Sequence, residues 1–129
     1  MKNLQDKKVI YVRAEGGLSG IKGAWDKLEA KIGGPKGRKF YGAYYAQTGE
    51  YRACAALREN DNSATLDLDV GIIPGGKYAD AKIYDWPAKI DKIAEVFDAL
   101  ATKYKADVTR PSLEFYRSQR ELILYLPVK

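Results

Sequence analysis

Two halves of the chain repeat one pattern at a constant offset. At the offset that takes Lys8 to Lys77, Val9 meets Tyr78, Ile21 meets Ile90, Ala24 meets Ile93 and Leu28 meets Phe97. Each half, residues 8–58 and 66–128, reads strand, helix, strand, strand. Two repeats are too few for a solenoid, and each has one amphipathic helix to cover its strands, so we expect the halves to pack about a pseudo-two-fold axis. The alternative is a chance resemblance between two β-α-β-β units.

The two expected helices rest on apolar residues at helical spacing. One face consists of Ile21, Ala24, Trp25, Leu28 and Ile32, and the other of Ile90, Ile93, Ala94, Phe97, Ala101 and Tyr104. We expect Ser19 to cap the first helix and Gly33-Gly34-Pro35 to end it. Residues 85–87 are typical of the start of the second helix.

Short β-branched and aromatic runs predict the strands. They span residues 9–12, 40–45, 51–57, 66–73, 77–84, 112–116 and 122–128, and the turn at 47–50 predicts a hairpin. A chain of 129 residues with 46% apolar content suits a single core. We therefore expect one domain over residues 1–129, of the α+β class, with antiparallel sheet, two main helices and a central cleft.

The absence of histidine limits the chemistry. It excludes Ser-His-Asp and Cys-His catalysis and the commonest zinc ligand, so catalysis would rest on carboxylates, tyrosines, lysines or bound water. We expect no metal and no cofactor. Cys54 lies among alanines, which favours a buried thiol over a reactive one.

The net charge of +5 is concentrated in residues 1–40. Lys36, Arg38 and Lys39 lie in a Gly/Pro loop without a nucleic-acid motif, so a solvated loop is favoured over a nucleic-acid surface, and direct DNA binding is not expected. The chain has no apolar run of about 20 residues and no signal-peptide pattern, so we expect no membrane partner and a cytoplasmic location.

The clearest candidate for chemistry is Glu114. Alternation along residues 112–116 places Ser112, Glu114 and Tyr116 on one face of a strand and Leu113 and Phe115 on the other. A carboxylate beside a phenol in an aromatic cleft favours a cation. The alternative is that Glu114 points to water or pairs with an arginine, Arg117 or Arg52.

Small and aromatic residues predict that cleft. Small strand residues leave space on a sheet unless a facing element fills it, and tyrosines around them would form a wall for a flat apolar ligand. The small residues are Gly42, Ala43, Ala53, Ala55, Ala56, Ala79 and Ala81, and the aromatic ones are Tyr41, Tyr44, Tyr45, Tyr51, Tyr78, Tyr84, Phe115, Tyr116 and Tyr125. The alternative is that the helices fill the space. Trp25 is expected in the core, whereas Trp86 is either a cleft rim or a contact that holds the helix start.

The chain resembles the GyrI-like small-molecule-binding domains, which are also the effector-binding domains of AraC-type and MerR-type multidrug-sensing regulators. The resemblance lies in the segments 39–45, 73–79, 110–116 and 124–128 and covers nearly the whole chain in order. It implies two β-α-β-β units and a hydrophobic, often cationic, aromatic ligand between them. By motif position the ligand-contacting glutamate falls on Glu114, with Tyr116 beside it; the candidate ligand-binding set is Glu114, Tyr116, Tyr45, Tyr41, Tyr78 and Trp86.

The resemblance also implies two other functions. Some stand-alone relatives hydrolyse strained cyclopropane rings with a glutamate, which would be Glu114 with Tyr116 or Tyr45 orienting the substrate; others bind DNA gyrase. Many relatives carry Gly-Pro-Tyr before each helix, where this chain has Gly16-Gly17-Leu18 and Asp85-Trp86-Pro87, and Trp86 is the candidate substitute for one tyrosine. With no helix-turn-helix pattern before Val9, we expect a stand-alone binding module. A hydrolase is the first alternative, and a module that binds a protein, such as gyrase or a separate regulator, is the second.

Overall fold

The fold is built on one eight-stranded antiparallel sheet, seen in a computed structural model that describes residues 1–33, 37–59 and 61–129. The strands are β1 (Lys2–Leu4), β2 (Lys7–Arg13), β3 (Phe40–Tyr45), β4 (Glu50–Ala56), β5 (Asp69–Ile73), β6 (Gly76–Tyr84), β7 (Ser112–Tyr116) and β8 (Glu121–Pro127). The helices are α1 (Ile21–Ile32), α2 (Ser63–Leu66) and α3 (Ile93–Lys103), with 3-10 turns η1 (Gly17–Gly20), η2 (Trp86–Ala88) and η3 (Ile90–Lys92). The α+β class is confirmed.

The strand order shows the expected two-fold relationship. The strand order is β1-β6-β8-β7-β3-β4-β2-β5. Counted outward from the central β3–β7 pair, one side has β3, β4 and β2, and the other has β7, β8 and β6. The two units, β2-α1-β3-β4 and β6-α3-β7-β8, therefore meet at β3 and β7. The register of that central pair places Tyr41 opposite Phe115 and Gly42 opposite Glu114.

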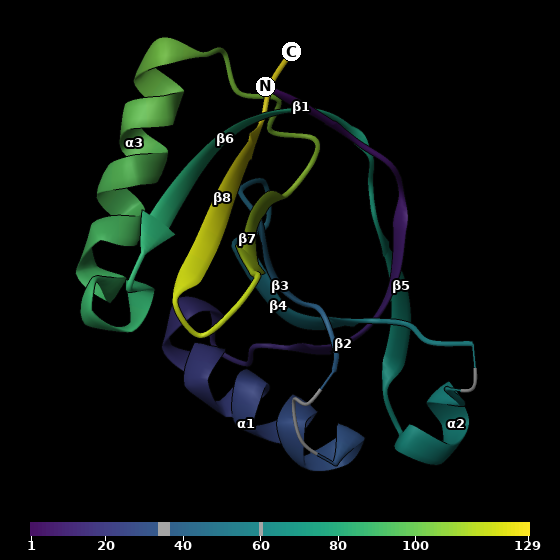
Figure 1. Ribbon diagram of the computed structural model, residues 1–129. Helices are drawn as coiled ribbons and strands as arrows, with labels where there is room; N and C mark the ends of the chain where they lie inside the picture. Colours follow the sequence, from purple (N-terminus) through teal and green to yellow (C-terminus); the bar gives the residue numbers. More distant parts are fainter. Residues whose placement is uncertain (34–36, 60) are drawn as a thin grey trace.

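The sheet closes into a ring because two continuous segments of the chain join its two edges. β1 at one edge runs on into β2, next to the opposite edge, and β5 at that opposite edge runs on into β6, next to β1. β1 and β2 pair with β6 and β5 in one register, in which Leu4 is opposite Gly76 and Lys7 is opposite Ile73. The two segments touch where each turns: the Gly75 amide donates to Asp6 Oδ1 at 2.6 Å, and a Cβ on Gly75 would overlap the backbone of residues 4–6. Figure 1 shows the ring with α1 and α3 outside it.

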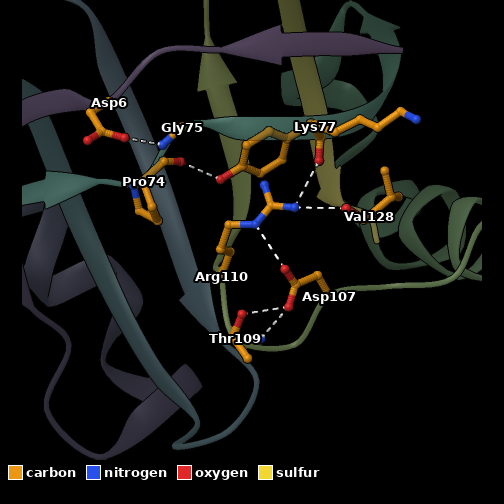
Figure 2. Close-up of polar contacts among 9 residues, drawn as sticks. Asp6, Pro74, Gly75, Lys77, Asp107, Thr109, Arg110 and Val128 are labelled. Carbon is orange, nitrogen blue, oxygen red and sulfur yellow. Dashed lines mark hydrogen bonds and ion pairs between the residues drawn. The ribbon is translucent and has the colours of Figure 1, made fainter.

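Arg110 ties the chain segments at this end of the ring together (Figure 2). Its Nη2 donates to the carbonyl oxygens of Lys77 at 3.1 Å and Val128 at 2.8 Å, and its Nε donates to Asp107 Oδ2 at 3.1 Å. Its guanidinium lies 4.8 Å from the centre of the Tyr78 ring. One side chain thus joins β6, the end of β8 and the loop before β7.

Side chains pack on both faces of the sheet, because alternate residues of each strand point to opposite faces. The inner face of the ring holds a core of Val9, Tyr11, Tyr41, Ala43, Cys54, Ile73, Tyr78, Leu113, Ile123 and Tyr125. On the outer face, α1 covers strands of the first unit and α3 covers β6 and β8. Cys54 is buried as expected, and burial raises the pKa of its thiol to about 12.

Four local expectations were wrong. Ser19 does not cap α1: its Oγ donates to the Gly16 carbonyl, and Gly20 precedes the helix without a side-chain cap. Residues 86–88 and 90–92 form 3-10 turns, so α3 begins only at Ile93, and Ile90 is 61% exposed. The expected strand over residues 66–73 begins only at Asp69, and Leu66 instead ends a short helix over residues 63–66.

The short helix over residues 63–66 has a local cause, because Asn62 accepts hydrogen bonds from the amides of Ala64 and Thr65, as a helix cap does. Gly33 ends α1 in the left-handed conformation, as expected, while Gly34, Pro35 and Lys36 lie outside the described residues. Contrary to the expectation, Arg38 does not belong to a solvated loop: it is ion-paired with Asp61 and only 7% of its side chain is exposed.

Candidate functional site

Glu114 lies on the outer face of the sheet, at the centre of the two-fold arrangement. The expected alternation is confirmed, since Leu113 joins the inner core and Phe115 packs against it. Glu114 Oε1 accepts two hydrogen bonds, from the hydroxyl groups of Tyr51 and Tyr116, each at 2.8 Å. Its carboxylate is therefore held by one residue of β4 and one of its own strand.

Gly42 makes room for this arrangement. It is opposite Glu114 in the register of β3 and β7, and opposite Ala53 in the register of β3 and β4. A Cβ at residue 42 would overlap the Tyr51 hydroxyl and the Glu114 carboxylate. The absence of a side chain at this position lets a tyrosine from β4 reach across β3 to a glutamate on β7.

Two tryptophans surround the Tyr116 ring. Trp25 on α1 lies 5.4 Å from it and Trp86 in η2 lies 5.0 Å from it, both edge to face. Trp25 Nε1 donates to the Tyr51 hydroxyl at 3.1 Å, and Trp86 Nε1 donates to the Ser118 carbonyl at 3.0 Å. The expectation for Trp25 was incomplete, because it packs against the core under α1 and also contacts the Glu114 cluster.

The two tyrosines stay protonated and act as donors. Burial, and then the Glu114 charge, raise the pKa of Tyr51 and of Tyr116 well above the ordinary value. Both hydroxyl protons point to the same oxygen, so Oε1 is fully engaged. In the described part of the chain no group donates to Oε2, which leaves that oxygen for a ligand or water.

Glu114 has no cationic partner among the described residues. The two arginines that could have paired with it have other partners: Arg117 pairs with Glu121 at 3.4 Å, and Arg52 pairs with Glu50. The alternative of a surface ion pair for Glu114 was therefore wrong. A half-buried carboxylate held by neutral donors keeps its charge available for a cation.

Two hollows border the cluster formed by Glu114, Tyr51, Tyr116 and Trp25, one through Glu114 and Tyr51 and the other through Tyr116 and Trp25. The one we call the Glu114 hollow, about 530 Å³, is lined by Ile21, Gly42, Tyr44, Tyr51, Ile93, Ala94, Phe97, Asp98, Ala101, Ser112, Glu114 and Leu126. The Trp hollow, about 630 Å³, is lined by Trp25, Glu29, Arg38, Phe40, Trp86, Tyr116, Arg117, Ser118 and Gln119. Because α1 and α3 contribute to the first and α1 and η2 to the second, the hollows lie along the boundary between the two units.

The predicted site residues divide between the two faces of the sheet. Glu114, Tyr116 and Trp86 lie together, but the other three tyrosines lie on the inner face. Tyr41 stacks on Phe115 at 4.8 Å, Tyr78 is fully buried, and Tyr45 lies beneath the Arg52 guanidinium. The expected single wall of tyrosines is thus two groups of aromatic residues with the sheet between them.

Several residues that line the hollows were not predicted as ligand-binding residues. Tyr51 was only one of the wall tyrosines, Gly42 was one of the small residues expected to leave space, Trp25 was expected in the core, and Asp98 had no expected role. The alternation of the hairpin could have put Tyr51 and Gly42 on one face. Their meeting with Glu114 depends on the β3–β7 pairing, for which the sequence carries no local signal.

No cluster of three or more His, Cys, Asp or Glu side chains suited to a metal ion occurs among the residues described. Within the same ranges, no helix is long and apolar enough to cross a membrane.

The comparison with solved structures shows that other proteins share the fold of this chain. No family model and no curated protein matches the sequence. Integron cassette protein VCH_CASS2 from the mobile metagenome of Vibrio cholerae is similar in structure, with a TM-score of 0.74, 21% identity, and 99% of this chain and 94% of that chain covered.

Two further solved structures share the architecture. SAV2435, solved with tetraphenylphosphonium bound, has a TM-score of 0.68 and 18% identity over 99% of this chain and 92% of its own. A hydrolase from Listeria innocua has a TM-score of 0.54 and 10% identity over 99% of this chain and 89% of its own. The fold therefore occurs in a protein solved with an aromatic cation and in one described as a hydrolase.

Proposed function

We propose that the chain binds a hydrophobic aromatic cation in the Glu114 and Trp hollows, with Glu114 as the anionic contact. The observation that carries the proposal is the Glu114 carboxylate itself. It is half-buried in the lining of the Glu114 hollow, its Oε1 is held by two phenols, and no cation in the described part of the chain neutralises it. Trp25, Trp86 and Tyr116 supply the aromatic faces that such a ligand favours.

The structure of SAV2435 with tetraphenylphosphonium supports the choice of ligand class, since that protein has the same fold. Tetraphenylphosphonium is therefore the first probe. We expect the intrinsic fluorescence of Trp25 and Trp86 to change on titration with it, and triphenylphosphine oxide, a neutral analogue, to bind more weakly.

The decisive variant is Glu114→Gln, which removes the charge and keeps the shape. We expect it to weaken binding by about tenfold or more, which corresponds to about 1.4 kcal/mol. Glu95→Gln is the matched control, because Glu95 lies on α3 outside both hollows and its side chain is 69% exposed. Equal affinity of the wild type and Glu114→Gln, or no binding of any aromatic cation, would refute the proposal.

Hydrolysis is the second candidate function, favoured by the neighbour from Listeria innocua described as a hydrolase and by the Glu114 Oε2 atom, to which none of the described groups donates. Glu114 would act as a general base toward a water molecule at Oε2, with Tyr116 orienting the substrate; such help contributes roughly 10²–10⁴ in rate. Tyr45, on the other face, cannot take part. Turnover of an electrophilic cyclopropane substrate that is lost in Glu114→Gln would establish it, and binding without turnover would exclude it for that substrate.

A further inference from the structure

The Glu114 hollow contains a second carboxylate, that of Asp98. We propose that Asp98 binds a second cationic group, so that the site prefers aromatic ligands with two positive centres to singly charged ligands of the same shape. This inference rests on the proposed function, because it takes Glu114 as the first anionic contact.

Asp98 reaches the hollow from the face of α3 that contributes to its lining. Ala94, Asp98 and Ala101 are spaced four and three residues apart, and so lie on one side of the helix. Both neighbours are alanines, which leave the Asp98 side chain uncovered. Among the residues that α3 provides to the hollow, Asp98 is the only one with a polar side chain.

The carboxylate of Asp98 is free in the described part of the chain. Its backbone carbonyl accepts a hydrogen bond from Thr102 Oγ1 at 2.9 Å, but no described group donates to its side chain. By contrast, Glu95 on the same helix pairs with Lys92 at 3.6 Å. Asp98 can therefore contact a ligand without breaking an existing interaction.

The charge of the hollow differs from that of the molecule. The chain carries a net charge of +5, yet the described lining of the Glu114 hollow includes two carboxylates and no lysine or arginine. The neighbouring Trp hollow includes Arg38 and Arg117. Positive groups of a ligand are thus attracted to the Glu114 hollow in particular.

The two carboxylates differ in depth, which sets the shape of the ligand. Glu114 is half-buried on the sheet, and Asp98 is exposed on the helix. A hollow of about 530 Å³ spans roughly 10 Å, so the two positive centres should lie less than that distance apart on a flat skeleton. One centre would lie at the sheet and the other at the rim.

A pair of nearly isosteric ligands tests this inference. N-methyl-4-phenylpyridinium and N,N′-dimethyl-4,4′-bipyridinium share a two-ring skeleton and carry one and two charges, and isothermal titration calorimetry gives both affinities. We expect the wild type at low salt to bind the dication about fivefold more tightly, the effect of one exposed charge pair with the statistical advantage of a symmetric ligand. High salt should reduce the preference.

Asp98→Asn should lower the preference to about the twofold statistical advantage while it leaves monocation affinity nearly unchanged. Glu95→Gln, a variant with the same change in charge, should keep the full preference. If the wild type prefers the dication by no more than about the twofold statistical advantage, or if Asp98→Asn keeps the full preference, the inference is wrong and the proposed function stands. If neither ligand binds although tetraphenylphosphonium does, the inference alone is wrong, and if none of the three binds, both are overturned.

Discussion

Gly42 and Glu114 are opposite each other in the central strand pair, and the carboxylate of Glu114 occupies space that a side chain at residue 42 would fill. Tyr51 shares that space, with its hydroxyl 2.8 Å from Glu114 Oε1. The outer face at the centre of the sheet thus holds a polar cluster instead of packed apolar side chains.

Gly42→Ala should disturb the cluster directly. The added Cβ would overlap both Tyr51 and Glu114, so one of them must move. We expect a loss of about 1–3 kcal/mol in the free energy of unfolding, typical of overpacking, and weaker binding of tetraphenylphosphonium. Denaturant unfolding and fluorescence titration measure the two effects.

Gly23→Ala is the control for that variant. Gly23 lies within α1 and a Cβ there meets no atom within 4 Å, so alanine should stabilise the protein by about 0.5–1 kcal/mol and leave binding unchanged. If Gly42→Ala behaved like Gly23→Ala, the close approach at the strand pair would not matter.

Tyr51→Phe should show the contribution of the hydroxyl group. The change removes a donor to Glu114 and leaves Trp25 Nε1 without its acceptor, at a cost of about 1–3 kcal/mol in stability, and it frees Glu114 to change orientation. Tyr44→Phe is the matched control, because Tyr44 lines the same hollow but its hydroxyl has no hydrogen-bond partner among the described residues. Similar losses in both variants would argue against a specific role of Tyr51.

Arg110→Ala should destabilise the ring rather than the site. Its side chain is 16% exposed and makes contacts with three chain segments, so we expect a loss of about 3 kcal/mol, because the Val128 carbonyl loses this donor and the guanidinium no longer packs on Tyr78. Arg120→Ala removes a side chain that is 83% exposed and pairs with Asp85, and should cost less than about 1 kcal/mol. Thermal unfolding of the two variants separates these expectations, and equal melting temperatures would contradict them.

Asp61→Asn should change stability in a pH-dependent way. Arg38 donates two hydrogen bonds of 2.7 Å to Asp61, and these hold the pKa of Asp61 at about 2, below its ordinary value of 3.8. Since the folded pKa is the lower one, the stabilisation is fully present above about pH 4 and is lost as the pH falls toward 2. Breaking a buried pair costs roughly 3 kcal/mol.

The measurement is the difference in unfolding free energy between the wild type and Asp61→Asn from pH 2 to 6. We expect it to be largest above pH 4 and to shrink toward pH 2. Asp26→Asn is the control, because the pair of Asp26 with Lys22 is exposed and worth less than about 1 kcal/mol. A difference that stays constant with pH would show that the charge of Asp61 does not matter.

Much of the fold could be predicted because its signals are local. The helical spacing from Ile21 to Ile32, the Gly33 stop and the turn at Gly49 each depend on residues a few positions apart. The repeat predicted one feature that depends on residues far apart in the chain, the pseudo-two-fold arrangement of the two units. Where a local signal was overruled, a specific contact competed with it, such as the Asn62 side chain that caps residues 63–66.

The sequence by itself determined the two β-α-β-β units and the alternation that exposes Glu114 and Tyr116 on one face, since side-chain period follows directly from strand geometry. Only the tertiary structure decided which tyrosines share that face: pairing of β3 with β7 brings Tyr51 to Glu114 across Gly42 and turns Tyr41 inward, and the ring buries Tyr78. Strand pairing and closure depend on contacts between residues far apart in the chain, and no local pattern of residue types records them.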